Sequence, residues 1–169
     1  MVKLRKIEPS DLPFLYQWEN DATMWADSDT HNPLSRHDLH QYIENTTGDI
    51  YRDGQLRLMI ESSEAAPGTT SGIVGCIDLF DFDARNRKAA IGMYIAPEAR
   101  GKGVGKQAVQ LLLDYAFNFL HLRMVYSIIS VNNVACSRLY EQMDFLPSSS
   151  LRAWTLEGDA ILWQKMNTN

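Results

Sequence analysis

The clearest candidate for chemistry in this sequence is the segment 100–106, in which glycines alternate with basic and apolar residues. It consists of Arg100, Gly101, Lys102, Gly103, Val104, Gly105 and Lys106. Glycine has no Cβ, so alternate glycines allow left-handed torsions and let several backbone N–H groups converge on one ligand. A helical pattern follows at once, and its N-terminal dipole favours an anion. The segment therefore predicts a polyphosphate site, while a turn that only relieves crowding is the weaker interpretation.

Two common nucleotide motifs are disfavoured by the spacing. A P-loop requires Gly-Lys-Ser/Thr to place a hydroxyl on magnesium, whereas Gln107 follows Lys106 here. A Rossmann fingerprint requires G-x-G-x-x-G in the first strand-to-helix turn, with an acid about 20 residues later. Here the spacing is G-x-G-x-G, the turn lies past the middle of the chain, and residues 120–125 include no acid. The phosphate ligand is therefore of another kind.

The segment 100–105 resembles the R/Q-x-x-G-x-G/A signature of the GNAT superfamily of acetyl-CoA-dependent N-acetyltransferases. A second segment, "NNVACSRLYEQMDF" at 132–145, is similar to that family's N-x-x-A-x-x-L-Y-E-x-x-G-F. The likeness is good over about 73–145 and otherwise extends only to the order of elements. Asp144 replaces the family's usual glycine, and Cys136 its usual alanine or serine.

The resemblance implies a fold and a cofactor site. The glycine turn would hold the pyrophosphate of acetyl-CoA, which is the co-substrate. The fourth and fifth strands would diverge, and the backbone of Met93, Tyr94 and Ile95 would hydrogen-bond the pantetheine arm between them. An N–H near Met93 would face the developing oxyanion. From the residues alone, Asn132 or Asn133 caps the following helix, and the resemblance implies that Asn133 also contacts the pantetheine.

Tyr140 matches the family's tyrosine that protonates the departing thiolate. A phenol with an ordinary pKa near 10 stays protonated at neutral pH yet can give up its proton to a thiolate. From the residues alone, half-buried packing on an amphipathic helix is the simpler interpretation of this tyrosine. Cys136 as an acyl-carrying nucleophile is disfavoured, because no histidine lies near it in sequence.

The acceptor amine arrives protonated, so a carboxylate or a water that it orients should remove a proton. Trp25 with nearby acids would form an aromatic and acidic pocket for an alkylammonium ion. The candidates for this pocket and for the base are Trp25, Asp27, Asp29, Asp78, Asp81 and Asp83. Asp81 and Asp83 are better interpreted as solvated or turn-forming acids.

We therefore expect an N-acetyltransferase that moves an acetyl group directly from acetyl-CoA to a primary amine. A di- or polyamine such as spermidine is favoured, since the acidic loop resembles that of polyamine acetyltransferases. The alternatives are acetylation of a protein N-terminus, as in enzymes that modify ribosomal proteins, and a non-catalytic acyl-CoA-binding sensor. The partner is thus a small amine or a peptide N-terminus, and a homo-oligomer is allowed.

Composition restricts the remaining possibilities. The 169 residues suit one domain, 1–169, and a net charge of -5 argues against a nucleic-acid partner. The charged start and the lack of an apolar run of about 20 residues predict a cytoplasmic protein without a signal peptide or membrane span. Two cysteines without Cys/His metal spacing predict neither a disulfide framework nor a metal site.

Hydrophobic periodicity predicts the elements that position these residues. We expect strands at 3–7, 55–61, 73–80, 88–95, 123–131, 151–155 and 160–166. Helices are expected in 8–20, at 35–46, after the glycine turn to about 119, and in 133–143. The predicted class is α+β (mixed α/β). With the resemblance, this implies a mixed, mostly antiparallel sheet of about seven strands, splayed between strands four and five, with helices on both faces.

Overall fold

A mixed sheet forms the frame of the molecule. The computed structural model describes residues 1–27, 31–63 and 72–168, and in this part seven strands pair in the order β1-β2-β3-β4-β5-β7-β6. All neighbours are antiparallel except β4 and β5, which are parallel. The strands are β1 (Val2–Lys6), β2 (Leu56–Ser62), β3 (Ile73–Asp83), β4 (Lys88–Ile95), β5 (Met124–Ser130), β6 (Leu146–Thr155) and β7 (Gly158–Met166).

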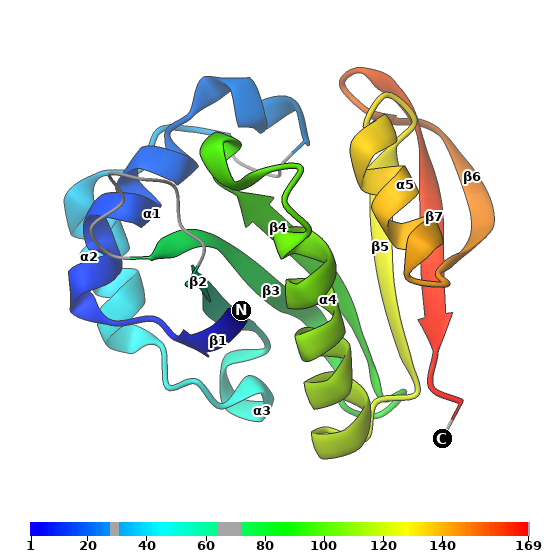
Figure 1. Ribbon diagram of the computed structural model, residues 1–169, viewed down its shortest axis with the longest axis horizontal. Coiled ribbons are helices and arrows are strands. Elements are labelled where there is room, and N and C mark those ends of the chain that lie inside the picture. The colour runs from blue at the N-terminus through cyan, green and yellow to red at the C-terminus, as the bar shows by residue number, and fades with distance from the viewer. Residues whose placement is uncertain (28–30, 64–71, 169) are drawn as a thin grey trace.

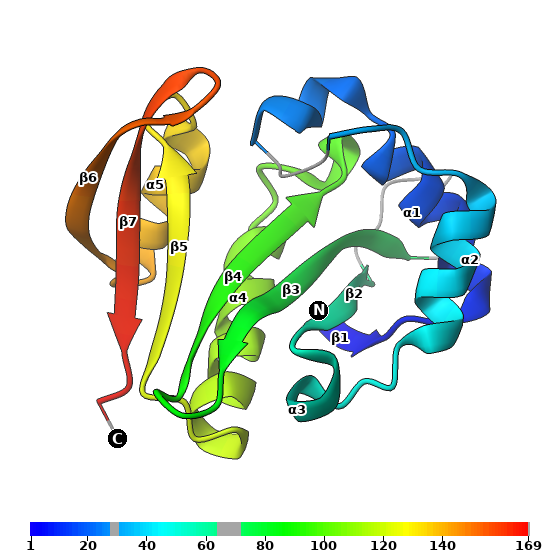
Figure 2. The same ribbon diagram turned by 180° about the vertical axis from the view of Figure 1, so that it is seen from behind.

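Helices lie on both faces of this sheet (Figures 1 and 2). They are α1 (Leu12–Glu19), α2 (Arg36–Asn45), α3 (Ile50–Asp53), α4 (Val104–Asp114) and α5 (Val134–Gln142), with 3-10 turns η1 (Pro9–Asp11), η2 (Ala22–Asp27) and η3 (Pro97–Ala99) and a π-helical turn η4 (Tyr115–Phe119). Local sequence explains their starts. Ser35, for example, accepts a hydrogen bond from the Asp38 amide in a capping box. No helix in the described part is long and apolar enough to span a membrane.

Two hydrophobic clusters occupy opposite faces of the sheet. On β2, the neighbours Met59 and Ile60 belong to different clusters, as do Cys76 and Ile77 on β3, because successive side chains of a strand alternate between faces. The larger cluster packs beneath α4 and α5, and the smaller one beneath α1 and α2. Figure 2 shows that no helix crosses β5, β7 and β6 on the face opposite α5.

The predicted fold class and element order are confirmed, with local corrections. The strand expected at 151–155 begins at Leu146, and α3 and η2 were not predicted. Asp144 has φ 58, so the position where the family usually has glycine requires a left-handed backbone, which aspartate tolerates better than most residues. Residues 64–71, which follow β2, lie outside the described residues.

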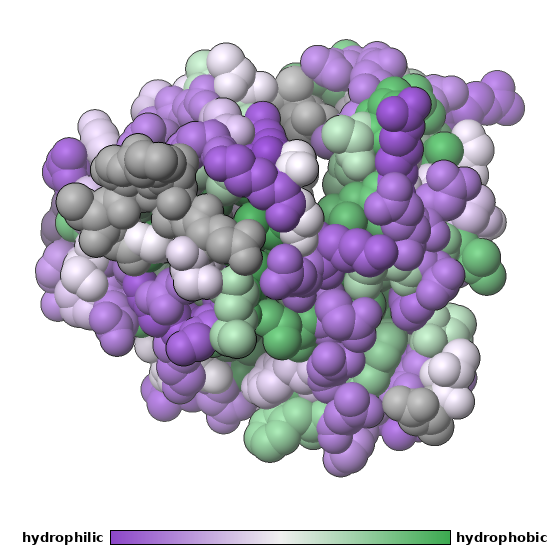
Figure 3. Space-filling model, in the orientation of Figure 1, coloured by the Kyte–Doolittle hydropathy of each residue, from purple (hydrophilic) through white to green (hydrophobic). Residues whose placement is uncertain are grey.

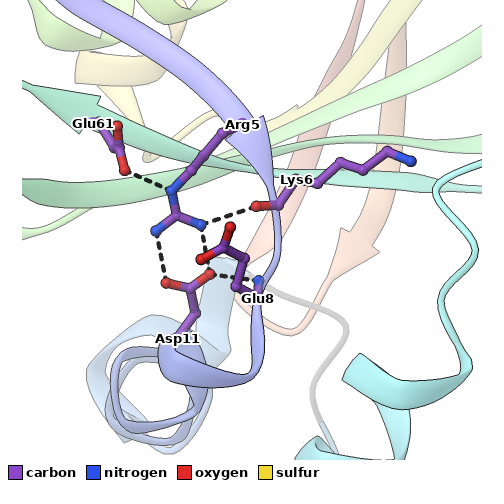
Figure 4. Close-up of polar contacts among 5 residues, drawn as sticks. All are labelled: Arg5, Lys6, Glu8, Asp11 and Glu61. Carbon is purple, nitrogen blue, oxygen red and sulfur yellow. Dashed lines mark hydrogen bonds and ion pairs between the residues drawn. The ribbon is translucent and has the colours of Figure 1, made fainter.

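A buried carboxylate ties β1 to the start of α1. Asp11 is fully buried and accepts hydrogen bonds of 2.7 and 2.8 Å from the Arg5 guanidinium and of 2.8 Å from the Glu8 amide (Figure 4). Arg5 also donates to Glu61 on β2. The bond to Asp11 is the largest cause that raises the pKa of Arg5 above its ordinary value.

We predict that Asp11→Asn lowers the free energy of unfolding by about 3 kcal/mol, because it leaves the Arg5 charge without its buried partner. Urea denaturation followed by circular dichroism measures the change. Glu61→Gln is the control, since this side chain is 36% exposed and its loss should cost less than about 1 kcal/mol. Equal losses for the two variants would contradict the importance of the buried pair.

Candidate functional site

The strands β4 and β5 form a fork. They pair only at Lys88–Met124, Ala89–Val125 and Ala90–Tyr126. Beyond these pairs, β4 continues along β3 and β5 continues along β7. Residues 91–95 of β4 therefore have no strand partner on the β5 side among the described residues. The predicted splay between strands four and five is confirmed, and Met93, Tyr94 and Ile95 lie on its open edge.

The three glycines of the turn have two different roles. Gly101 (φ 73) and Gly103 (φ 75) have left-handed torsions, and a Cβ on either would meet open space. Backbone conformation, not crowding, thus requires these two glycines. At Gly105 a Cβ would lie 3.1 Å from the Met93 Cε and 3.4 Å from a Leu139 Cδ. The third glycine therefore lets β4, α4 and α5 approach one another closely.

The start of α4 presents donors to solvent. Gly103 is its N-cap and supplies no side-chain hydrogen bond. The first intrahelical bond runs from the Gln107 amide to the Gly103 carbonyl, so the amides of Val104, Gly105 and Lys106 have no helical acceptor. Lys102 and Lys106 are exposed beside them. This geometry suits a phosphate-bearing ligand, since backbone donors, the helix dipole and two cations meet at one place.

Arg100 points away from the turn. Its Nε donates to the Ile95 carbonyl at 2.9 Å, and its guanidinium lies 5.9 Å from the centre of the Tyr94 ring. A further contact of 3.6 Å reaches the Met24 sulfur in η2. The structure thus separates Arg100 from Lys102 and Lys106, and places it where β4 ends against η2.

Tyr140 lies on the other side of the fork, on α5. Its side chain is 2% exposed and its ring packs edge-on against Phe145, with centroids 4.5 Å apart. Burial raises its pKa above the ordinary value, the nearby Cys136 raises it further, and the nearby Ser127 hydroxyl partly offsets the rise. The phenol therefore keeps its proton at neutral pH.

The turn and α5 meet over the fork. Met93 and Leu139 both approach Gly105, and Leu139 immediately precedes Tyr140. Asn133 caps α5 by accepting a hydrogen bond from the Cys136 amide at 3.1 Å, which confirms its expected role as a cap. In the space-filling view, the surface between the start of α4 and α5 is hollowed (Figure 3). The structure thus brings together Met93 of β4, Gly105 of the turn and Leu139 of α5.

The predicted acceptor residues are less closely grouped. Trp25 lies half-buried in η2, and its Nε1 donates to the Glu19 carbonyl at 3.0 Å. Asp27 ends the same turn, and Asp29 lies outside the described residues. Of the predicted pocket, the described residues therefore place Trp25 and Asp27 in one turn.

Asp78 is held by an arginine that sequence reasoning missed. Arg57 on β2 donates to both Asp78 oxygens at 2.8 Å and to Glu19 at 2.5 Å, and its ring-stacking partner is Tyr42. An arginine within the apolar run "QLRLMIE" was the available signal for a partly buried ion pair. Arg57 and Glu19 border a cavity of about 290 Å³, whose lining is Glu19, Leu34, Asp38, Leu39, Tyr42, Gln55 and Arg57.

The remaining acids behave differently from each other. Asp83 accepts hydrogen bonds from the Asn86 amide and side chain at 2.8 and 2.7 Å, which lower its pKa, so it forms the turn as expected. Asp81 is exposed with φ 47 at a bulge in β3. Among the described residues, no three His, Cys, Asp or Glu side chains gather as metal ligands would.

Comparison with known proteins agrees with this geometry. The family model described as the acetyltransferase (GNAT) domain matches residues 2–146. The spermidine N(1)-acetyltransferase of Vibrio cholerae is 26% identical over 151 residues, which cover 88% of this chain and 80% of that protein.

Solved structures of a Vibrio cholerae enzyme have the same fold. Its spermidine N-acetyltransferase in complex with CoA and spermine has a TM-score of 0.85 at 22% identity, covering 99% of this chain and 96% of that one. A dodecameric structure of the enzyme has a TM-score of 0.81 at 24% identity, covering 99% and 94%.

We predict that Gly103→Ala weakens CoA binding about tenfold, because a Cβ in a left-handed position distorts the turn that carries the amide donors. Isothermal titration calorimetry with CoA measures the effect. Gly54→Ala is a matched control. Gly54 has φ 71 and open space around its Cβ position, and it lies at the end of α3, outside the fork. Both variants should lose similar stability, and equal CoA affinities for them would contradict the assignment of the turn.

Proposed function

The chain belongs to the GNAT acetyltransferases, N-acetyltransferases that use acetyl-CoA, and we propose that its acceptor is a di- or polyamine such as spermidine. The observation that carries the reaction is the fork, with the glycine turn on one side and Tyr140 on the other. The acceptor class is supported by the relative in Vibrio cholerae, whose similarity covers 88% of this chain.

The cofactor residues have separable roles in this proposal. Amides at the start of α4, with Lys102 and Lys106, bind the pyrophosphate. The open edge of β4 at Met93, Tyr94 and Ile95 binds the pantetheine arm, as a further strand would. The N–H near Met93 stabilises the developing negative charge on the acetyl oxygen. When bound, acetyl-CoA supplies a thioester whose acetyl carbon accepts an amine.

Tyr140 is the proposed general acid. The amine first loses a proton to a base or to water, and its nitrogen then replaces sulfur on the acetyl carbon. Tyr140 donates its hydroxyl proton to the departing sulfur, and the surplus proton on the new amide nitrogen returns to the phenolate through water. The net products are an acetamide, a free thiol and one proton.

The acceptor pocket is proposed near η2. Trp25, Asp27 and Asp29 would contact the alkylammonium chain, and Asp78 would act at the sheet beneath it. Both Asp78 oxygens accept hydrogen bonds from Arg57, so we assign this carboxylate the role of ordering the acceptor surface.

We also propose that the chain self-associates. The edge strand β6 and the turn after it leave Leu146, Trp154 and Leu156 largely exposed. An edge strand with exposed apolar side chains is a usual place for contacts between copies. The dodecameric Vibrio cholerae enzyme supports this proposal. A cytoplasmic location and the lack of a nucleic-acid partner stay predictions from composition.

The acceptor is tested by thiol release from acetyl-CoA with spermidine, putrescine and short peptides in turn. We expect the highest kcat/KM with a polyamine, since acids near η2 suit an alkylammonium chain. A faster reaction with a peptide N-terminus would replace the polyamine by a protein acceptor. CoA binding without thiol release for any amine would indicate a sensor.

We predict that Tyr140→Phe lowers kcat about a hundredfold while the CoA dissociation constant changes less than about threefold. The phenyl ring still packs on Phe145, so only the proton donor is lost. Steady-state kinetics and calorimetry with CoA separate the two quantities. Tyr115→Phe is the control, since Tyr115 is a partly buried tyrosine stacked on Phe119. An unchanged kcat for Tyr140→Phe would remove this residue from the mechanism.

A further inference from the structure

The Arg100 side chain bonds to the last residue on the open edge of β4. Its Nε donates to the Ile95 carbonyl at 2.9 Å. The Ala96 amide, which belongs to the same peptide unit as that carbonyl, donates to Val74 on β3. The C=O and N–H of a trans peptide unit point in opposite directions. The Ile95 carbonyl therefore points away from β3, toward the side from which β5 has parted, and Arg100 covers this end of the open edge.

The same guanidinium also reaches the turn η2. It lies 5.9 Å from the centre of the Tyr94 ring, and one of its Nη atoms is 3.6 Å from the Met24 sulfur. The Tyr94 ring in turn packs against Trp18 of α1, with ring centroids 5.1 Å apart. Both views of the fold show η2, the blue turn that follows α1, beside the end of β4 (Figures 1 and 2). Arg100 thus connects the end of β4 with the turn that carries predicted acceptor residues.

The hydrogen bonds of Thr23 and Met24 are local. The Thr23 amide donates to the Asp21 carboxylate at 3.0 Å, and the Met24 amide donates to the Asp21 carbonyl at 2.9 Å. Such bonds shape a turn but do not fix its place relative to the sheet. The contact between Met24 and Arg100, by contrast, joins residues that are 76 positions apart in the chain.

We propose that Arg100 is a positioning residue for the amine acceptor: it fastens η2 to the end of β4 and so holds the acceptor turn beside the fork. This inference rests on the proposed acceptor pocket near η2. In the sequence Arg100 directly precedes Gly101 of the turn proposed to bind the pyrophosphate. Its contacts, however, run to the acceptor side.

The shape of arginine suits this role. A guanidinium is planar, donates from several nitrogens at once and can lie against an aromatic ring, whereas lysine carries the same charge on a single nitrogen. Attraction of a pyrophosphate depends mainly on charge, which Arg100→Lys keeps. The proposed role depends on the planar group, which Arg100→Lys removes. This variant therefore separates the two roles.

The first test measures the KM for spermidine by thiol release and the CoA dissociation constant by calorimetry, in Arg100→Ala and Arg100→Lys. We expect KM to rise about tenfold in both variants, with a CoA dissociation constant within about threefold of the wild-type value. Arg85→Ala is the control and should change neither quantity. It removes an exposed arginine from the turn before β4, at the opposite end of that strand.

Two results would overturn the proposal. A normal KM in Arg100→Lys, together with weakened CoA binding in Arg100→Ala, would assign Arg100 to the pyrophosphate. A lower KM in Arg100→Ala would show that the Arg100 charge repels the ammonium group, so that its main effect is not to hold η2.

Hydrogen exchange measured by mass spectrometry follows η2 without cofactor or acceptor. Arg100→Ala should speed the exchange of the amides at 22–27, because the turn loses its contact with the end of β4. Exchange in β2, at 56–62, should stay at the wild-type rate, which shows that the sheet is intact. Unchanged exchange at 22–27 would contradict the proposed role.

These measurements distinguish failure of this inference from failure of the proposed function. If a peptide is acetylated and spermidine is not, the proposed acceptor class fails, and the KM for the peptide tests Arg100 instead. If spermidine is acetylated but Arg100→Ala changes neither KM nor exchange at 22–27, only the Arg100 inference fails. If no amine is acetylated, both fail.

Discussion

The parting of β4 and β5 after three residue pairs is the constraint on which the rest of the structure depends. Backbone N–H and C=O groups inside a sheet need partners, and a strand edge left open in the middle of a protein is costly unless water or a ligand fills it. The parallel direction of these two strands requires a long crossover, which is supplied by the turn and α4. The parallel arrangement of β4 and β5 is therefore associated with both the open edge of β4 and the helix α4, whose N-terminus lies beside that edge.

Close packing at Gly105 then joins the parts of the site. A Cβ there would lie in tight contact with the end of the Met93 side chain, at 3.1 Å, so glycine favours the close approach of β4, α4 and α5. Gly101 and Gly103 instead provide the left-handed backbone torsions of the turn. The same short motif thus combines a requirement of backbone torsion with one of packing, which explains why three glycines occur together.

The sequence allowed the cofactor side to be predicted in more detail than the acceptor side. Residues 88–95 were predicted as a strand with the observed bounds, because an apolar run ends in a glycine turn whose chemistry is local. The Arg57–Asp78–Glu19 network was not predicted, since its members are far apart in sequence and meet only when α1, β2 and β3 assemble.

The three pairs at Lys88–Ala90 also have a mechanical meaning. They are the strand pairs that join the β1–β4 half of the sheet to the β5–β7 half, and they lie at one end of β4 and β5. A ligand that bonds to the open edge of β4 and to residues near α5 connects the two halves where the strands are no longer paired. Such a ligand stabilises the folded protein by an amount that grows with the logarithm of its concentration over its dissociation constant, and it limits the relative motion of the two halves of the sheet.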